Sequence, residues 1–219
     1  MTDDKLFRLW PTTILRKRFA EHARMKPELM AFIKAYMDAD PEGRKANENS
    51  NLYESRYDIL KRHAEENPAL KALGGFLGRS FAEVGTAANM AFWKREGIRP
   101  EDLSVEITAS WFINYLSHGN VNPHLHGNCS WSCVYYLQMG APLDEMDGAT
   151  YFVSPANKSD GTDPGAAYAG EASRYFPAEE GTALFFPSHL VHGSFPYRGE
   201  APRIIFSANA RFEKRGGRT

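Results

Sequence analysis

The chain has 219 residues, with 26 lysines and arginines against 27 aspartates and glutamates, so its formal net charge is −1. A chain of this length can bury a sizeable core within one domain, and the balanced charge argues against a nucleic-acid partner or an acidic membrane surface. No segment approaches the roughly 20 apolar residues of a membrane span, and the first residues lack an apolar run of signal-peptide length, so we expect a cytoplasmic protein without a membrane partner.

The first hundred residues carry helical patterns. The segment "KPELMAFIKAYM", residues 26–37, has Pro27 where a helix could begin and apolar side chains on one side. A second helix is expected over about 67–92, because Asn67 can cap it and Pro68 can start it. Spacings of three and four predict its buried stripe, formed by Leu70, Leu73, Leu77, Phe81, Val84 and Ala88.

From Leu103 onward the pattern changes to short runs rich in β-branched and aromatic residues, each bounded by Gly, Pro, Asn or Asp. Their spacing leaves little room for crossover helices, so residues 103–212 are predicted to form an antiparallel double-sheet β domain of jelly-roll or barrel type. Residues 1–100 would support it, giving a single α+β domain over 1–219. The Gly- and Asp-rich stretch 154–170 predicts a surface loop suited to be a lid.

The stretch "NPHLHGN", residues 122–128, holds two histidines one residue apart. In an extended chain alternate side chains share a face, so His124 and His126 could point into one cavity. A histidine pair alone is more often solvated than metal-bound. A second cluster, "FFPSHLVHGSFP", changes this balance, because His189 or His192 could bring a third imidazole from a separate strand and leave one metal face open.

The segment "PRIIFSANARF" alternates strictly between two faces. One face is wholly apolar. The other carries Arg203, Ile205, Ser207, Asn209 and Arg211. An arginine inside a cavity needs an anion, and its guanidinium matches a carboxylate with two hydrogen bonds. An arginine in solvent at a sheet edge is the alternative.

These motifs together resemble the iron(II)/2-oxoglutarate-dependent oxygenases, and within them a bacterial and phage group of about this length. The resemblance covers most of residues 105–212, through "SWFINYLSHGNVNPHLH", "CVYYL", "DGATYF" and "EGTALFFPSHLVHGSFPYRGEAPRIIFSANARF". It implies a double-stranded β-helix (jelly roll) that holds Fe(II) and uses 2-oxoglutarate and O2.

Several residue roles follow from the resemblance. His124 and His192 match metal ligands, and Arg203 matches the residue that grips the far carboxylate of 2-oxoglutarate. Asn114 matches a position where relatives place a polar side chain on the cosubstrate. Ser207 and Asn209 share a face with Arg203, which makes them secondary candidates for binding the cosubstrate or for orienting water.

His126 stands where most of that superfamily has Asp or Glu. His126 could itself be a ligand, the position could be open, or Asn128 or an acid from elsewhere could fill it. We predict the first, a three-histidine site of His124, His126 and His192, with His189 as an alternative to His192. Three neutral imidazoles leave Fe(II) at +2, so dianionic 2-oxoglutarate would bring the site to neutrality.

The predicted function is therefore hydroxylation of a C–H bond in a small molecule or a peptide side chain, with decarboxylation of 2-oxoglutarate to succinate. One alternative is a three-histidine dioxygenase or isomerase that does not use 2-oxoglutarate. Another is a non-catalytic metal-binding β-sandwich module, since zinc also accepts three imidazoles. The substrate and the oligomeric state, a homodimer included, are left open.

Overall fold

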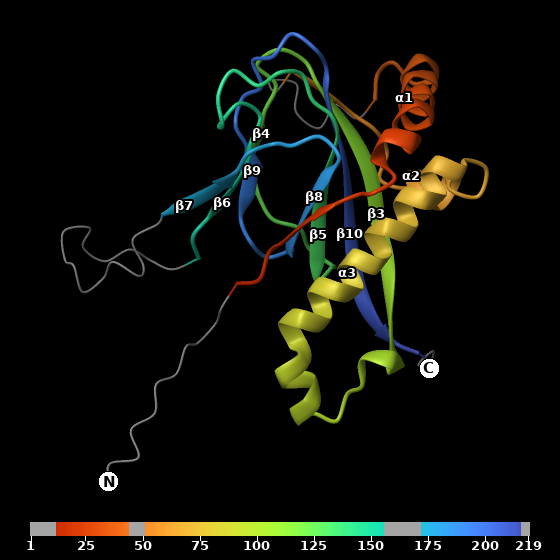
Figure 1. Ribbon diagram of the computed structural model, residues 1–219, viewed down its shortest axis with the longest axis vertical. Coiled ribbons are helices and arrows are strands. Elements are labelled where there is room, and N and C mark those ends of the chain that lie inside the picture. Colours follow the sequence, from red (N-terminus) through yellow and green to blue (C-terminus); the bar gives the residue numbers. More distant parts are fainter. Residues whose placement is uncertain (1–11, 44–50, 156–171, 216–219) are drawn as a thin grey trace, which may run out of the picture.

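The computed structural model describes residues 12–43, 51–155 and 172–215. Two antiparallel sheets and three α-helices make up these parts of the chain (Figure 1). The helices are α1 (His22–Ala39), α2 (Ile59–His63) and α3 (Pro68–Arg95), with a 3-10 turn η1 (Pro100–Asp102). Most of the predicted loop 154–170 lies outside the described residues.

The six-stranded sheet has the order β1-β8-β5-β10-β3-β2, and the four-stranded sheet has the order β4-β9-β6-β7. In chain order the strands are β1 (Leu15–Arg18), β2 (Leu52–Glu54), β3 (Leu103–Tyr115), β4 (Val121–His124), β5 (Trp131–Gln138), β6 (Thr150–Val153), β7 (Ser173–Phe176), β8 (Thr182–Pro187), β9 (His192–Ser194) and β10 (Arg203–Lys214). The predicted β-rich, antiparallel double-sheet character is confirmed. The first hundred residues contribute more than helical support, because β1 and β2 form the two edges of the larger sheet.

Helix α3 begins as its sequence predicts. The side chain of Asn67 accepts a hydrogen bond from the backbone N–H of Leu70 at 2.8 Å, and Pro68 occupies the first turn. Helix α1 differs from the prediction, since it begins at His22 and Pro27 lies inside it. Proline removes only one intrahelical hydrogen bond there, and apolar burial of the helix outweighs that loss.

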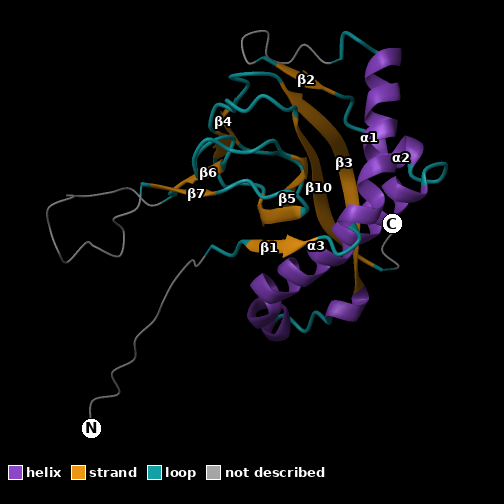
Figure 2. Ribbon diagram, turned by 45° about the horizontal axis from the view of Figure 1, so that its top comes forward, coloured by secondary structure: helices purple, strands orange, loops and turns teal. Residues whose placement is uncertain are grey.

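The helices cover one face of the six-stranded sheet. Figure 1 shows α3 running across its strands, and Figure 2 shows α1 and α2 on the same side, away from β4, β6 and β7. Leu73, Leu77 and Phe81 of α3 are buried in this core. The ring of Phe81 meets Phe185 of β8 edge to face, with centroids 5.1 Å apart. Ala88, the last residue of the predicted stripe, is exposed.

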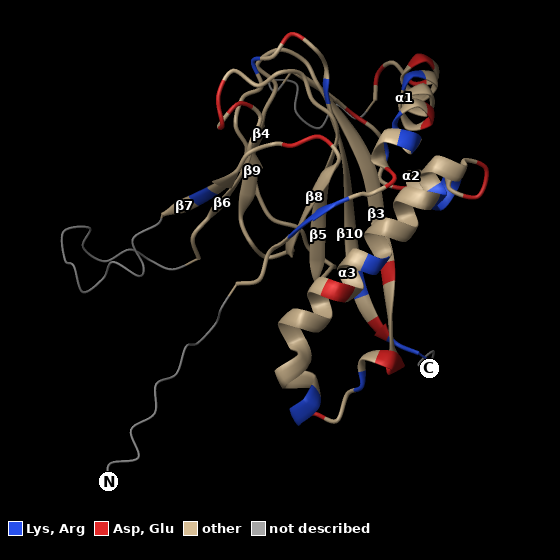
Figure 3. Cartoon of the chain, in the orientation of Figure 1, with Lys and Arg blue, Asp and Glu red and all other residues tan. Residues whose placement is uncertain are grey.

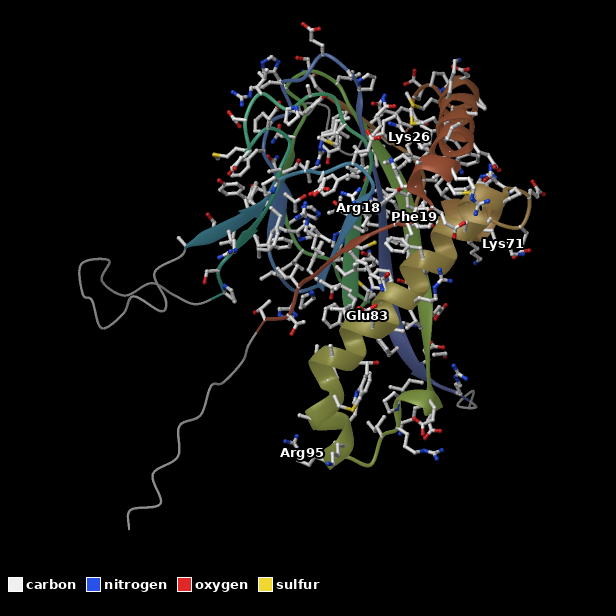
Figure 4. The ribbon with its side chains drawn as sticks, in the orientation of Figure 1. Arg18, Phe19, Lys26, Lys71, Glu83 and Arg95 are labelled. Carbon is white, nitrogen blue, oxygen red and sulfur yellow. The ribbon has the colours of Figure 1, made fainter. Side chains whose placement is uncertain are left out.

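The segment between β1 and α1 fastens α1 to the sheet. Phe19, labelled in Figure 4, stacks on Phe76 of α3 with ring centroids 4.8 Å apart. His22 Nδ1 lies 2.6 Å from the hydroxyl of Tyr135 on β5, and His22 Nε2 lies 3.2 Å from Glu180. The start of α1 is therefore held by an aromatic stack and a polar network together.

A second hydrophobic core fills the space between the two sheets. Trp111 and Ile113 of β3, Val134 of β5, Phe152 of β6 and Phe186 of β8 belong to it. Because side chains on a strand alternate between faces, the larger sheet supplies one set of residues to this core and another to the helices. The predicted split of β10 is found, with Ile205 in the inner core and Ile204, Phe206, Ala208 and Ala210 under the helices.

Most charged residues lie on the outside of this arrangement, whereas Arg203 and Glu54 are buried. Figure 3 shows basic and acidic residues interspersed over α1, α2 and α3. Exposed ion pairs such as Lys71–Glu65 and Arg99–Asp102 each contribute about 0–1 kcal/mol, so the two apolar cores carry most of the stability. Within the described residues, none of the helices has the length and apolar character needed to cross a membrane.

We expect Phe81→Ala to lower the free energy of unfolding by about 3–5 kcal/mol, because it opens a cavity where α3 meets β8. Phe92→Ala on the same helix is the matched control, since that ring is half exposed and its loss should change stability by about 0.5 kcal/mol or less. Urea unfolding followed by circular dichroism measures both. Equal effects of the two substitutions would contradict the packing described here.

Candidate functional site

Three histidines from two segments lie together at the four-stranded sheet. Antiparallel pairing of β4 with β9 sets His124 directly opposite His192. His126 follows two residues later and is held by a hydrogen bond from its backbone N–H to the carbonyl of Ser188 at 3.0 Å. The ring centroids are 4.4 Å apart for His124 and His192, 5.0 Å for His124 and His126, and 5.1 Å for His126 and His192.

In two of these rings, one nitrogen lies within hydrogen-bond distance of a backbone carbonyl oxygen. Nδ1 of His124 lies 2.9 Å from the carbonyl oxygen of Asn122, and Nδ1 of His192 lies 2.9 Å from that of Leu190. A carbonyl oxygen only accepts, so each Nδ1 carries a proton and Nε2 is the nitrogen that remains for a metal ion. This is the tautomer that a metal ion requires of an Nε2 ligand.

Aromatic side chains surround the cluster. Phe186 lies 4.5 Å from the ring of His192, and Trp111 lies 5.7 Å from that of His126, between centroids. Burial, followed by repulsion from His124, lowers the pKa of His192 to about 3 and that of His126 to about 4. Both rings are therefore neutral at pH 7 and can donate lone pairs.

The donor set fits a divalent first-row metal ion. One nitrogen from each of the three rings lies within 4.8 Å of the others, and no carboxylate belongs to this group in the described part of the chain. Imidazole suits iron and zinc, and three ligands leave positions open for small molecules. The alternative residues lie apart from this arrangement. His189 is exposed and lines a separate cavity beside Trp93, and Asn128 is exposed on the loop that follows His126.

A cavity of about 420 Å³ opens beside the histidines and is lined from both sheets. Its walls are largely apolar, and Arg203 at the start of β10 is among them. The volume falls in the range of small-molecule sites, about 300–1,000 Å³. A group that occupied this cavity would contact the three histidines and Arg203.

Arg203 is fully buried, and its three guanidinium nitrogens have no hydrogen-bond partner within the described residues. Its guanidinium carbon lies 3.9 Å above the ring of Tyr115 and 5.7 Å from that of Tyr136. Gly148 has φ +64°, and a Cβ at that position would come within 3.0 Å of the Arg203 side chain. The rings of Tyr115 and Tyr136 stabilise the positive charge of Arg203. No group among the described residues accepts a hydrogen bond from its guanidinium.

The other sequence candidates divide between the cavity and its outside. Ser207 is buried and lines the cavity. Asn114 is absent from the described cavity lining, and its Nδ2 lies 3.9 Å from the sulfur of Met37 on α1. It alternates with Ile113 and Tyr115, which face inward, so the pleat directs Asn114 to the helix side. Asn114 therefore lies on the other face of β3 from the cavity lining, and its cosubstrate role stays a prediction.

Some cavity residues were missed at the sequence level. Thr150 on β6 and Ser194 on β9 are cross-strand partners that line the cavity. The hydroxyls of Thr150 and Tyr136 lie 2.7 Å apart. Glu54 on β2 is buried, lines the cavity and accepts a hydrogen bond from the hydroxyl of Tyr57 at 3.1 Å. Each belongs to a strand whose partner is distant in sequence, so only the folded chain brings them together.

Comparison with known families gives one match. Residues 109–209 match a family described as "Putative 2OG-Fe(II) oxygenase". The matched segment spans a little under half of the chain and contains all three histidines, Arg203 and Ser207. No match was found among curated protein sequences.

Solved structures of low sequence identity share the fold. A prolyl-4-hydroxylase from Pseudomonas putida is 16% identical with a TM-score of 0.56, and the match covers 93% of each chain. The viral collagen prolyl hydroxylase of Paramecium Bursaria Chlorella virus-1, solved with 2OG, is 13% identical with a TM-score of 0.51, covering 90% of this chain and 94% of that one. HygX from Streptomyces hygroscopicus, solved with nickel and 2-oxoglutarate, is 12% identical with a TM-score of 0.52, covering 91% and 82%.

The histidine burial predicts how acid affects the metal-free protein. The pKa values of His126 and His192 are about 4 and about 3 when folded, against about 6.5 when unfolded. The unfolded chain therefore binds protons first as pH falls, so stability is lost between about pH 6.5 and about pH 3. We expect urea midpoints to fall on acidification in wild type and to fall less in His192→Asn. Ring-proton NMR that titrates both histidines near their unfolded pKa would contradict this.

Proposed function

We propose that this chain, an Fe(II)/2-oxoglutarate-dependent oxygenase by the family of its residues 109–209, hydroxylates a C–H bond of a small molecule or a peptide side chain. The observation that carries this proposal is that Arg203, whose guanidinium has no hydrogen-bond partner within the described residues, lines the same cavity as the three histidines. A dianion that also binds a metal would satisfy both groups at once.

The proposal includes the architecture. The two antiparallel sheets both line the cavity, and the helices cover the larger sheet. These sheets would form a double-stranded β-helix. Residues 103–212 would form this core, and residues 1–100 would support it and close the edges of the sheet. The whole of 1–219 would then be one oxygenase domain.

His124, His126 and His192 would hold Fe(II). The support is their mutual distance, the lowered pKa values of His126 and His192, and the two Nδ1 contacts that leave Nε2 to face a metal ion. Three neutral ligands keep the full +2 charge on the site, which favours a dianionic cosubstrate more strongly than a site with one carboxylate would.

Arg203 would bind the far carboxylate of 2-oxoglutarate. Its planar fork can donate two parallel hydrogen bonds to a carboxylate. The hydroxyls of Tyr136 and Thr150 lie on strands that line the same cavity, and Ser207 is on the same face of β10 as Arg203. The far carboxylate of the cosubstrate would therefore lie beside Arg203, with Thr150 and Ser207 also lining the cavity.

Fe(II) in such a site supplies activation of O2 coupled to decarboxylation of 2-oxoglutarate to succinate. The protein's own residues contribute binding and exclusion of water. Trp111, Phe186 and Ile205 line the cavity with apolar surface, which strengthens the charge pairing of Arg203 with its ligand. Leu125 and Tyr57 also line the cavity and are exposed, so a substrate would reach the histidines past these two side chains.

Two other functions use the same residues. Arg203 could grip the carboxylate of the substrate itself in a three-histidine dioxygenase or isomerase without 2-oxoglutarate. Three imidazoles could also hold zinc in a module without activity. Binding of 2-oxoglutarate, and its oxygen-dependent conversion to succinate, separates both from the proposal.

We expect 2-oxoglutarate to give the anaerobic Fe(II) protein a visible charge-transfer band. Arg203→Met should retain iron and weaken 2-oxoglutarate binding by about 1.5–3 kcal/mol or more, the scale of hydrogen bonds to a charged group. Arg211→Met is the matched control, because Arg211 is on the same strand but exposed and paired with Glu106. Undiminished affinity in Arg203→Met, or no band in wild type, would overturn the assignment.

The role of His126 has a separate test. His126→Ala should lower the iron bound per chain sharply, whereas His126→Asp should retain iron because a carboxylate oxygen replaces the imidazole nitrogen as a ligand. His189→Ala, at an exposed histidine outside the cluster, should bind as wild type does. Metal analysis after anaerobic loading measures all three, and full iron content in His126→Ala would exclude His126 as a ligand.

A further inference from the structure

The three histidines are held in two different ways. His124 and His192 each direct Nδ1 at a backbone carbonyl. His126 meets a side chain instead, since its Nδ1 lies 3.5 Å from Nδ2 of Asn209 on β10. Asn209 was predicted as a secondary candidate for the cosubstrate or a water, and in the structure its side chain contacts a histidine.

Asn209 is itself held by a neighbouring strand. The hydroxyl of Ser132 on β5 donates a hydrogen bond to Asn209 Oδ1 at 2.8 Å, and the two residues are register partners. Ser132 is buried. Because a carboxamide has one accepting and one donating end, fixing Oδ1 on Ser132 turns Nδ2 toward His126.

This orientation decides which nitrogen of His126 carries the proton. An amide nitrogen only donates, so Nδ1 of His126 is the acceptor and the proton of the neutral ring is on Nε2. That is the opposite tautomer to the one in His124 and His192. A protonated Nε2 has no lone pair for a metal ion.

A half turn of the side-chain amide of Asn209 would leave Nε2 of His126 with a lone pair for a metal ion. It would place Oδ1 against Nδ1 of His126 and Nδ2 against the hydroxyl of Ser132, which can accept as well as donate. An N–H on Nδ1 would then have its acceptor, and Nε2 would have its lone pair. Metal-binding histidines generally donate their second ring N–H to such a partner.

We propose that Asn209 is the positioning residue of His126, and that its amide, seated on Ser132, selects the tautomer of that ring. Nδ2 faces the ring in the metal-free protein and Oδ1 faces it when a metal is bound. The change leaves the charge unaltered, because the proton on Nε2 passes to solvent and another arrives at Nδ1. This inference rests on the proposed function in that His126 is taken as a metal ligand.

Ring-nitrogen NMR tests the tautomer directly. Long-range 1H–15N spectra of the metal-free protein should show His126 protonated at Nε2, with His124 and His192 protonated at Nδ1. Asn209→Asp presents only acceptors to the ring, so His126 should change to the Nδ1–H form without metal. An unchanged His126 tautomer in Asn209→Asp would overturn the proposal, and a merely structural role for Asn209 would not produce the change.

Metal affinity gives the second readout. Asn209→Leu removes the acceptor, and Zn(II) measured by chelator competition should bind about 10–100-fold more weakly, whereas Asn209→Asp should bind at least as tightly as wild type. Asn89→Ala is the matched control, because Asn89 is a half-buried asparagine on α3 that donates to the carbonyl of Gly85. Wild-type affinity in Asn209→Leu would contradict the proposal.

The two proposals can fail separately. Failure of the wild-type protein to bind 2-oxoglutarate would overturn the proposed function and leave the tautomer result standing. If Asn209→Leu does not fold, the NMR result for Asn209→Asp still decides the role of Asn209.

Discussion

The alternation of β10 is the constraint on which the rest of the structure depends. This strand lies between β5 and β3, so both of its edges are hydrogen-bonded and its side chains must point to opposite faces. Phe206 and Ala208 lie under the helices, while Arg203 and Ser207 face the cavity. A slip of one residue would turn Arg203 toward the helix side of the sheet and move Phe206 into the cavity, so apolar packing on one face determines the chemistry on the other.

The cavity contains a buried guanidinium, that of Arg203, with no hydrogen-bond partner among the residues that the structure describes. An uncompensated buried charge costs about 3–5 kcal/mol, and the contact of Arg203 with Tyr115 recovers about 2 kcal/mol or less. Burial of apolar side chains in the two hydrophobic cores offsets the remaining cost of the buried charge. Any anion that fills the place stabilises the folded state as well as occupying the site, so ligand binding and folding are coupled through one side chain.

The three histidines are positioned by contacts with residues outside the cluster. The register of β4 with β9 sets the positions of His124 and His192, and backbone carbonyls set their tautomers. His126 lies beyond the end of β4 and depends on β10 and β5 through Asn209 and Ser132. The larger sheet therefore reaches His126 through a polar contact, whereas it reaches His192 through the ring of Phe186.

The amino-acid sequence alone determined the local patterns: the capped start of α3 at Asn67, the two faces of β10, and the histidines in two separate segments. These follow from periodicity and capping, which act over a few residues. Only the tertiary structure decided that His192 rather than His189 joins the cluster, that Asn114 faces α1, and that Asn209 contacts His126. Such outcomes depend on the register between distant strands and on which alternating side chains of β3 face the cavity. No local pattern contains this information, because apolar burial across the whole sheet selects both.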